Sequence, residues 1–223
     1  VVILSRELGK IAAFAKGARR PNSHLIGVTR PFIFGTFEVY RGRDSYTIQK
    51  ANVTNYFEEL VSDLDGVLYG YYFAELAEYY GRENLDAADM INLLYVAFKA
   101  LVNKSLPNEL VRYIYEIRLI AVNGECPDFF SCAGCGSEKE LQLYSYKENG
   151  MYCVECAASS GDGIVLQSST LYTLQYIITA PLTKLFNFVV KADVLNELKK
   201  VVNRIEFITF DKHFKSKEML DIG

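Results

Sequence analysis

The sequence predicts an α+β protein in which a basic, OB-fold-like β-barrel precedes an α-helical domain with an inserted four-cysteine module. Three observations favour this class. Short apolar runs separated by turn residues occupy the first fifty positions, helical periodicity begins near residue 53, and two Cys-x-x-Cys pairs interrupt the helical pattern. We therefore expect a barrel domain at 1–52 and a helical domain at 53–223, with the cysteine module inserted at 124–163.

Four segments near the amino terminus are predicted to be β-strands: 1–4 and 10–16 are short apolar runs, and 32–40 and 46–51 alternate between two kinds of residue. Turn formers separate them, at Gly9, at 17–23 with Pro21, and at 42–45. Several short strands without a helix between them favour a small closed barrel, since closure removes exposed strand edges. Such a barrel needs one more strand, which we expect upstream of Val1, so the first strand is apparently missing.

Apolar residues at helical spacing predict five amphipathic helices, over 64–80, 90–102, 107–124, 171–178 and 194–205. Glycines at 81 and 124 mark the expected ends of the first and third helices. In the first helix the spacing predicts one apolar face made of Leu64, Val67, Leu68, Tyr71, Tyr72, Leu76, Tyr79 and Tyr80. We expect the first three of these helices to pack on one another.

Composition excludes several classes of protein. Half of the 223 residues are hydrophobic, which suffices for a sizeable core, yet no apolar run approaches the roughly 18 residues that span a bilayer. The chain does not open on a secretory signal, and its five cysteines suit a reducing compartment. We expect a cytoplasmic protein without a membrane partner.

Four of the five cysteines form the pattern C-x2-C-x17-C-x2-C, at Cys132, Cys135, Cys153 and Cys156. Two thiolates on one tight turn can occupy two corners of a tetrahedron, and a second turn returning on a hairpin can supply the other two. The spacing predicts a structural zinc site, because four protein ligands leave no position for a reactive water. Buried thiols or redox-active pairs are the alternatives. Cys126 lies outside the pattern and is expected to be a buried side chain.

Charge is distributed unevenly along the chain. The first fifty residues contain nine Lys or Arg and three acids, a balance of +6, so the remaining 173 residues carry −9 of the net charge of −3. A basic segment on an acidic body indicates a polyanionic partner, although such a cluster can also be a solvated loop. The candidate DNA-binding residues are Lys10, Lys16, Arg19, Arg20, Arg41 and Arg43.

Aromatic residues accompany these cations. Phe14, Phe32, Phe34 and Tyr40 occur within or beside the predicted strands. Aromatic rings beside cations can stack nucleobases, but rings in a small barrel more often fill its core.

The stretch S-R-E-L-G-K-I-A-A-F-A-K-G-A-R-R-P-N-S, from Ser5 to Ser23, resembles the amino-terminal region of the RecO family of bacterial DNA repair and recombination mediators. The resemblance continues through a helical segment, both cysteine pairs and a closing Lys215-Ser216-Lys217.

This resemblance implies an OB-fold and a non-enzymatic mediator of DNA repair and homologous recombination. It implies binding of single- and double-stranded DNA, annealing of strands coated by single-strand-binding protein, and action with RecR to promote RecA loading. Contacts with the C-terminal tail of single-strand-binding protein and a place at the cytoplasmic nucleoid are implied too. Lys10, Lys16, Arg19 and Arg20 match the basic barrel surface of the family.

Two other classes stay open. A structural-zinc enzyme of nucleotide metabolism is the first, but the chain has no phosphate-binding glycine motif, no H-E-x-x-H and only two histidines. The acids Asp63, Asp65, Asp86 and Asp89 fall at predicted helix starts, where capping is the common role. The second is a pure protein-interaction scaffold, with helix 64–80 presenting a groove.

Overall fold

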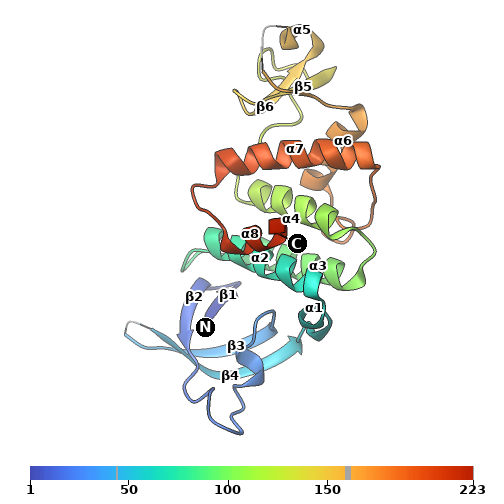
Figure 1. Cartoon of the computed structure of the whole chain (residues 1–223). Helices are drawn as coiled ribbons and strands as arrows, with labels where there is room; N and C mark the ends of the chain where they lie inside the picture. Colours follow the sequence, from blue (N-terminus) through green and yellow to red (C-terminus); the bar gives the residue numbers. More distant parts are fainter. Residues whose placement is uncertain (44, 159–161, 223) are drawn as a thin grey trace. The chain divides into compact units, whose positions relative to one another are not determined.

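The computed structural model describes residues 1–43, 45–158 and 162–222. The chain forms two compact units, one of Val1–Lys104 with Phe214–Gly223 and the other of Ser105–His213. The first contains the N-terminal sheet and four helices, and the second contains the cysteine module and the remaining helices (Figure 1). None of the described helices has the length and apolar character needed to cross a membrane.

The N-terminal sheet has four strands, all predicted from the sequence: β1 (Val2–Ser5), β2 (Gly9–Phe14), β3 (Phe34–Arg41) and β4 (Tyr46–Asn55). Their order is β1-β2-β4-β3, with β2 and β4 parallel and the other two pairs antiparallel. A short 3-10 helix, η1 (Gly27–Thr29), lies in the connection from β2 to β3. Within the described residues no β1–β3 pairing closes the sheet, so the closed OB-like barrel stays a prediction.

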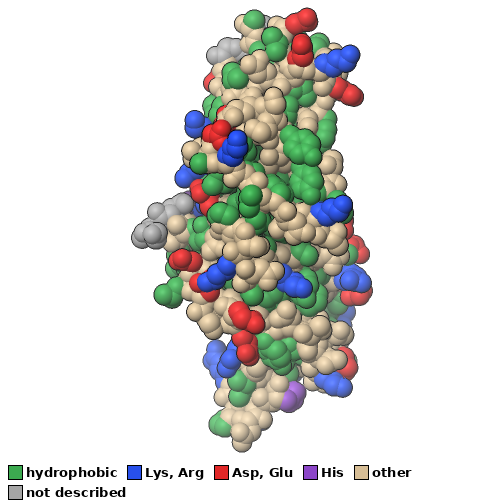
Figure 2. Space-filling model, turned by 90° about the vertical axis from the view of Figure 1, so that its right-hand side faces the viewer, with side chains coloured by type: hydrophobic (Ala, Val, Ile, Leu, Met, Phe, Trp, Pro, Cys, Tyr) green, Lys and Arg blue, Asp and Glu red, His purple; other side chains and the backbone are tan. Residues whose placement is uncertain are grey.

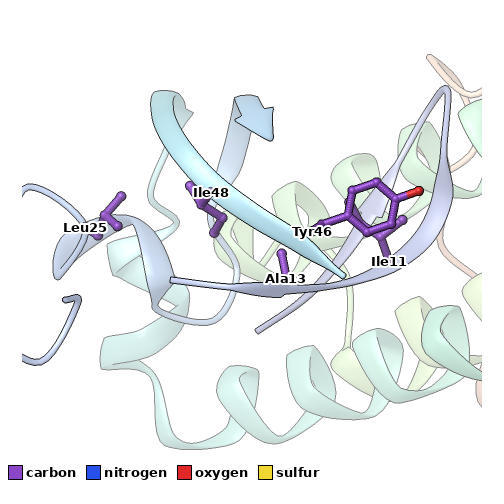
Figure 3. Close-up of a cluster of buried hydrophobic side chains, with 5 residues drawn as sticks. All are labelled: Ile11, Ala13, Leu25, Tyr46 and Ile48. Carbon is purple, nitrogen blue, oxygen red and sulfur yellow. The ribbon is translucent and has the colours of Figure 1, made fainter. Parts of the chain in front are cut away.

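Alternation along the strands places the core on one face of this sheet. Ile11 and Ala13 of β2 are buried together with Tyr46 and Ile48 of β4, and Leu25 joins them from the loop after β2 (Figure 3). Neighbouring residues of a strand face opposite sides of the sheet. The residues that alternate with these core positions on β2 and β4 therefore lie on the outer face.

The helices of the first unit are α1 (Glu58–Ser62), α2 (Leu64–Tyr80), α3 (Ala88–Asn103) and α8 (Lys215–Ile222). The predicted extents of α2 and α3 are confirmed, whereas α1 and α8 were not predicted. The predicted apolar face of α2 is partly wrong, since Leu64 is 85% exposed and Tyr71 is 47% exposed. The buried positions include Gly66 and Gly70, which allow Leu60 and Phe32 to approach the helix closely.

The second unit contains three long helices, α4 (Asn108–Val122), α6 (Ser168–Thr179) and α7 (Ala192–Thr209), which pack on one another. Its small sheet has the order β6-β5-β7 and is built from β5 (Leu141–Ser145), β6 (Gly150–Cys153) and β7 (Ile164–Val165). The one-turn helix α5 (Val154–Ala157) directly follows β6.

One arginine connects two of these helices. Arg118 of α4 donates to the carbonyl oxygens of Ile177 and Ile178 at the end of α6. This contact stabilises the carboxyl end of α6, where carbonyls lack helical partners.

A charged cluster is buried between α4 and α7. Arg112 Nε donates to Glu116 Oε1 at 2.8 Å, and Arg112 Nη2 lies 3.7 Å from Glu206 Oε1. Glu116 is completely buried, and among the residues that the structure describes its Oε2 atom has no hydrogen-bond partner. Burial, together with the neighbouring Glu206 carboxylate, raises the pKa of Glu116 well above its ordinary value of 4.5. Two carboxylates thus share one buried guanidinium.

The raised pKa predicts how stability depends on pH. Above the ordinary carboxyl pKa, the folded state holds a proton at Glu116 more strongly than the unfolded state does, so stability falls as pH rises. Glu116→Gln keeps a neutral, hydrogen-bonding side chain and should flatten this dependence. Urea unfolding at pH values from about 5 to 8 measures it, with Glu138→Gln as an exposed control. If the free energy of unfolding changed with pH equally in Glu116→Gln and in the unmodified protein, Glu116 would not be the cause of the pH dependence.

Candidate metal centre and nucleic-acid interface

The four cysteines of the two Cys-x-x-Cys pairs come together in the structure. The sulfur atoms of Cys132, Cys135, Cys153 and Cys156 all lie within 4.8 Å of one another. The Sγ atoms of Cys135 and Cys153 are 3.8 Å apart. A tetrahedron with zinc–sulfur bonds of about 2.3 Å has sulfur–sulfur edges of about 3.8 Å, so the donor set fits a tetrahedral zinc ion in size and in chemistry.

Local backbone structure positions the first pair. The amide of Gly136 donates to Cys132 O at 2.8 Å, and Gly136 has φ of 73°, which closes a tight turn around the two thiols. Gly134 lies close to the second pair, since a Cβ there would be 3.2 Å from Cys156 Sγ, tighter than an ordinary contact. This glycine therefore leaves room for Cys156 to reach the first pair.

The second pair arrives on the predicted hairpin. Strands β5 and β6 pair antiparallel, with Ser145 opposite Gly150, so residues 146–149 form a four-residue hairpin loop in which Asn149 has φ of 49°. The amide of Cys153 donates to Cys132 Sγ at 3.3 Å. Burial raises the pKa of Cys132, but hydrogen bonds from backbone amides outweigh it and lower the pKa to about 6. A thiol that ionises this readily suits metal binding.

The fifth cysteine has a different environment. Cys126 lies outside the four-sulfur group, and burial raises the pKa of its thiol to about 12. The expectation that it is a packed side chain and not a fifth ligand agrees with this environment.

The cysteine module is anchored to α7 by Arg204. This side chain donates to Tyr146 O at 2.7 Å, and its guanidinium lies 5.6 Å from the centre of the Tyr146 ring. The ring of Tyr144 stacks on Phe129, and both are fully buried. The module therefore has a small core of its own.

The predicted DNA-binding cations are exposed with one exception. Lys16, Arg19 and Arg20 follow β2 in successive turns, while Arg41 ends β3 and Arg43 follows it, and all five side chains are exposed. In the part of the chain that the structure describes, no carboxylate forms an ion pair with Lys16, Arg19 or Arg20. On the molecular face drawn in Figure 2, by contrast, Lys or Arg and Asp or Glu side chains are largely interspersed.

Lys10 differs from the other predicted cations. Its Nζ atom donates to Glu78 O at 2.8 Å, near the carboxyl end of α2. A cation favours that end of a helix, so Lys10 has a structural role in holding β2 against α2. Gly81, which ends α2, belongs to the same contact, because a side chain there would meet Lys10 Cβ at 2.9 Å.

The four aromatic residues considered as base-stacking candidates have different environments. Phe32 is buried, with its ring 5.2 Å from that of Phe98, and the ring of Phe34 packs at 4.5 Å on Tyr95. Phe14 and Tyr40, however, are 60% and 63% exposed. The sequence did not distinguish the exposed Phe14 and Tyr40 from the packed Phe32 and Phe34. The alternation of β2 explains the exposure of Phe14, because it places this ring on the face opposite the buried Ile11 and Ala13.

The capping role expected for acids at helix starts is met only in part. Asp86 Oδ1 accepts from the amide of Ala88 at the start of α3, whereas Asp63, before α2, makes no side-chain cap and forms an ion pair with Lys104 at 3.2 Å. A hollow of about 530 Å³ lies between α2 and α8, lined by Leu68, Tyr71, Ala74, Glu75, Glu78, Lys215, Ser216 and Met219. This hollow is the structural counterpart of the groove that the scaffold alternative requires.

Comparisons with known proteins cover nearly the whole chain. Residues 1–57 match the family described as Recombination protein O N terminal, and residues 61–218 match Recombination protein O C terminal. A protein of Acetivibrio thermocellus named DNA repair protein RecO is 31% identical over 99% of this chain and 88% of its own length. Proteins of the same name from Oceanobacillus iheyensis and Bacillus subtilis are 29% and 27% identical, each over 99% of this chain and 85% and 86% of their own lengths.

The first matched region contains the basic N-terminal sheet, and the second contains helices and the four-cysteine cluster. The chain belongs to the RecO family.

Proposed function

We propose that this protein is a DNA repair and homologous recombination mediator that binds single- and double-stranded DNA and anneals complementary strands without catalysing a covalent step. The observation that carries the proposal is the group of exposed cations after β2, Lys16, Arg19 and Arg20. Cations without intramolecular partners are available to phosphates, and neutralising two strands lowers the repulsion that opposes their pairing. Arg41 and Arg43 are further exposed cations of the proposed surface, and Lys10, whose ammonium donates to Glu78 O, would support it by holding β2 in place.

The proposal includes partners and a metal. Names of the relatives place them in DNA repair, and the family resemblance supports action with RecR and with the C-terminal tail of single-strand-binding protein to promote RecA loading. It also supports a closed OB-fold around the N-terminal sheet and a cytoplasmic, nucleoid-associated protein. Cys132, Cys135, Cys153 and Cys156 would hold one structural zinc ion, which would fix the hairpin of the cysteine module.

Removing three cations should weaken DNA binding in a way that reveals their role. Each phosphate contact with a single strand contributes about 0.7 to the slope of log affinity against log salt, so Lys16→Ala, Arg19→Ala and Arg20→Ala together should reduce that slope by about 2. Binding of labelled oligonucleotides of different sequence, titrated from low to moderate salt, measures this effect. The loss should be equal for all sequences, because phosphates carry no sequence information.

A matched control removes the same charge elsewhere. Lys184, Lys191 and Lys200 are exposed in the second unit, and their replacement by alanine should leave the slope close to that of the unmodified protein. An equal reduction in both triple variants would show that net charge alone governs binding. Affinity independent of salt in the unmodified protein would refute phosphate binding by these cations.

An annealing assay tests the mediator role. Complementary strands coated with single-strand-binding protein should pair faster with the unmodified protein than with the Lys16, Arg19 and Arg20 variant. Addition of RecR and RecA to the same coated strands measures the loading step. If annealing proceeded equally well with the triple variant, these three cations would not be needed for the pairing of DNA strands.

A further inference from the structure

We infer that Phe14 and Tyr40 form a base-stacking row on the outer face of the N-terminal sheet, so that single-stranded nucleic acid binds there through its bases as well as its phosphates. This inference rests on the proposed DNA-binding function and adds a specific binding site to it. The two rings are 60% and 63% exposed, although large aromatic side chains usually contribute to a core.

The strand register brings the two rings into one row. Phe14 of β2 is paired with Thr47 of β4, and Tyr40 of β3 is paired with the same Thr47 from the other side. Residues directly opposite each other in a sheet point to the same face, so Phe14, Thr47 and Tyr40 share a face. The buried core residues of β2 and β4 occupy the opposite one (Figure 3).

The spacing suits separate bases. Neighbouring strands lie about 4.8 Å apart, so the two aromatic positions are separated by about 10 Å, two strand spacings across Thr47. In the described residues neither ring packs on another aromatic ring. Each ring therefore offers an open surface on which a different base of one strand can stack.

Charge on the same region is complementary to a phosphate backbone. Lys16 follows Phe14 by two residues and is exposed. Arg41, directly after Tyr40, alternates to the opposite face, where its guanidinium lies 5.7 Å from the centre of the buried Tyr46 ring. Glu38 is the acid of β3, and it stands opposite Lys50 of β4 in the ladder, so these two charges offset each other. Aromatic rings flanked by cations are the combination that binds single strands with little sequence preference. An apolar protein partner would not require the cations.

A fluorescence experiment tests this directly, because the chain contains no tryptophan. Tyr40→Trp introduces a single tryptophan, whose emission should be quenched when oligothymidylate of about 20 nucleotides, longer than the roughly 4–16 that an OB-fold covers, is added. An abasic oligonucleotide of equal length carries the phosphates without bases and should cause no quenching. Tyr172→Trp, on an exposed position of α6, is the control variant and its emission should not respond.

Affinity measurements give a second readout. Phe14→Ala and Tyr40→Ala should each weaken binding of oligothymidylate about tenfold, while the slope against salt stays unchanged because no cation is lost. Binding of a blunt duplex, whose bases are already stacked, should change much less.

The outcomes distinguish the inference from the function on which it rests. Salt-dependent binding without quenching in the Tyr40→Trp variant, or with equal quenching by the abasic strand, would overturn the stacking row and leave the phosphate surface in place. Absence of oligonucleotide binding by the unmodified protein would overturn both.

Discussion

Cys153→Ser is expected to abolish zinc binding and to unfold the cysteine module while the N-terminal sheet stays folded. Cys153 is a buried member of the four-cysteine cluster at the end of β6, and serine removes the sulfur of one proposed ligand next to the amide that donates to Cys132 Sγ. Metal binding at such sites is coupled to folding, with apparent free energies of about 10–16 kcal/mol in zinc-finger peptides. Metal content should fall from one zinc per chain to near zero.

Amide hydrogen exchange locates the effect. Protection should be lost in β5 and β6 and retained in β2 and β4, because the two sheets belong to different compact units. Cys126→Ser is the matched control, since Cys126 lies outside the sulfur cluster, and it should keep the metal. If Cys153→Ser retained stoichiometric zinc, or if anaerobically purified protein contained none, the structural zinc site would be wrong.

Arg112→Met should destabilise the second unit by about 3–5 kcal/mol, because removal of the guanidinium leaves the Glu206 carboxylate and the buried Glu116 carboxyl without the cation that they share. Glu116 is completely buried and Glu206 is 5% exposed, so water cannot replace the lost partner. Methionine retains much of the arginine volume, which confines the change to charge and hydrogen bonding. Urea unfolding near neutral pH, followed by circular dichroism, gives the difference in free energy.

The double variant Arg112→Met with Glu116→Gln separates the electrostatic cause from simple packing. A neutral amide at position 116 removes an ionisable carboxyl from the buried cluster and should recover part of the lost stability. The loss should also be smaller at acidic pH, where the raised pKa of Glu116 allows this carboxyl to be neutral. A loss below about 1 kcal/mol, or one equally large at every pH, would exclude the buried charge as its source.

Strands and helices whose signal lies in residues close together in the sequence were predicted well. The apolar run from Lys10 to Lys16 and the helical spacing of Leu110, Ile114 and Ile117 are local signals, and the corresponding strand and helix are present. The four-cysteine site is local in the same sense, because its ligands come in two short turns joined by one hairpin. The one-turn helix α1 and the C-terminal α8 were missed, since they are short and packing on α2 stabilises them.

The predicted apolar face of α2 shows where local signals are insufficient. Tyr71 and Leu64 have the right spacing and hydrophobicity, yet both are exposed. The helix instead presents its small residues, Gly66 and Gly70, to Phe32 and Leu60. Close approach can favour small residues over large ones at a contact, and a hydrophobicity pattern does not register this preference.

The family, the basic character of the amino-terminal segment, the alternating strands and the cysteine spacing could all be read from the chain alone, because residues close together in the sequence carry each of them. Only the tertiary structure showed which aromatic rings are exposed and which cations form hydrogen bonds within the protein. Lys10 is held by a carbonyl 68 residues away, and the parallel pairing of β2 with β4 brings Phe14 and Tyr40 to one row. These arrangements depend on strand pairing and helix packing between distant segments, whose geometry is set by the fold as a whole.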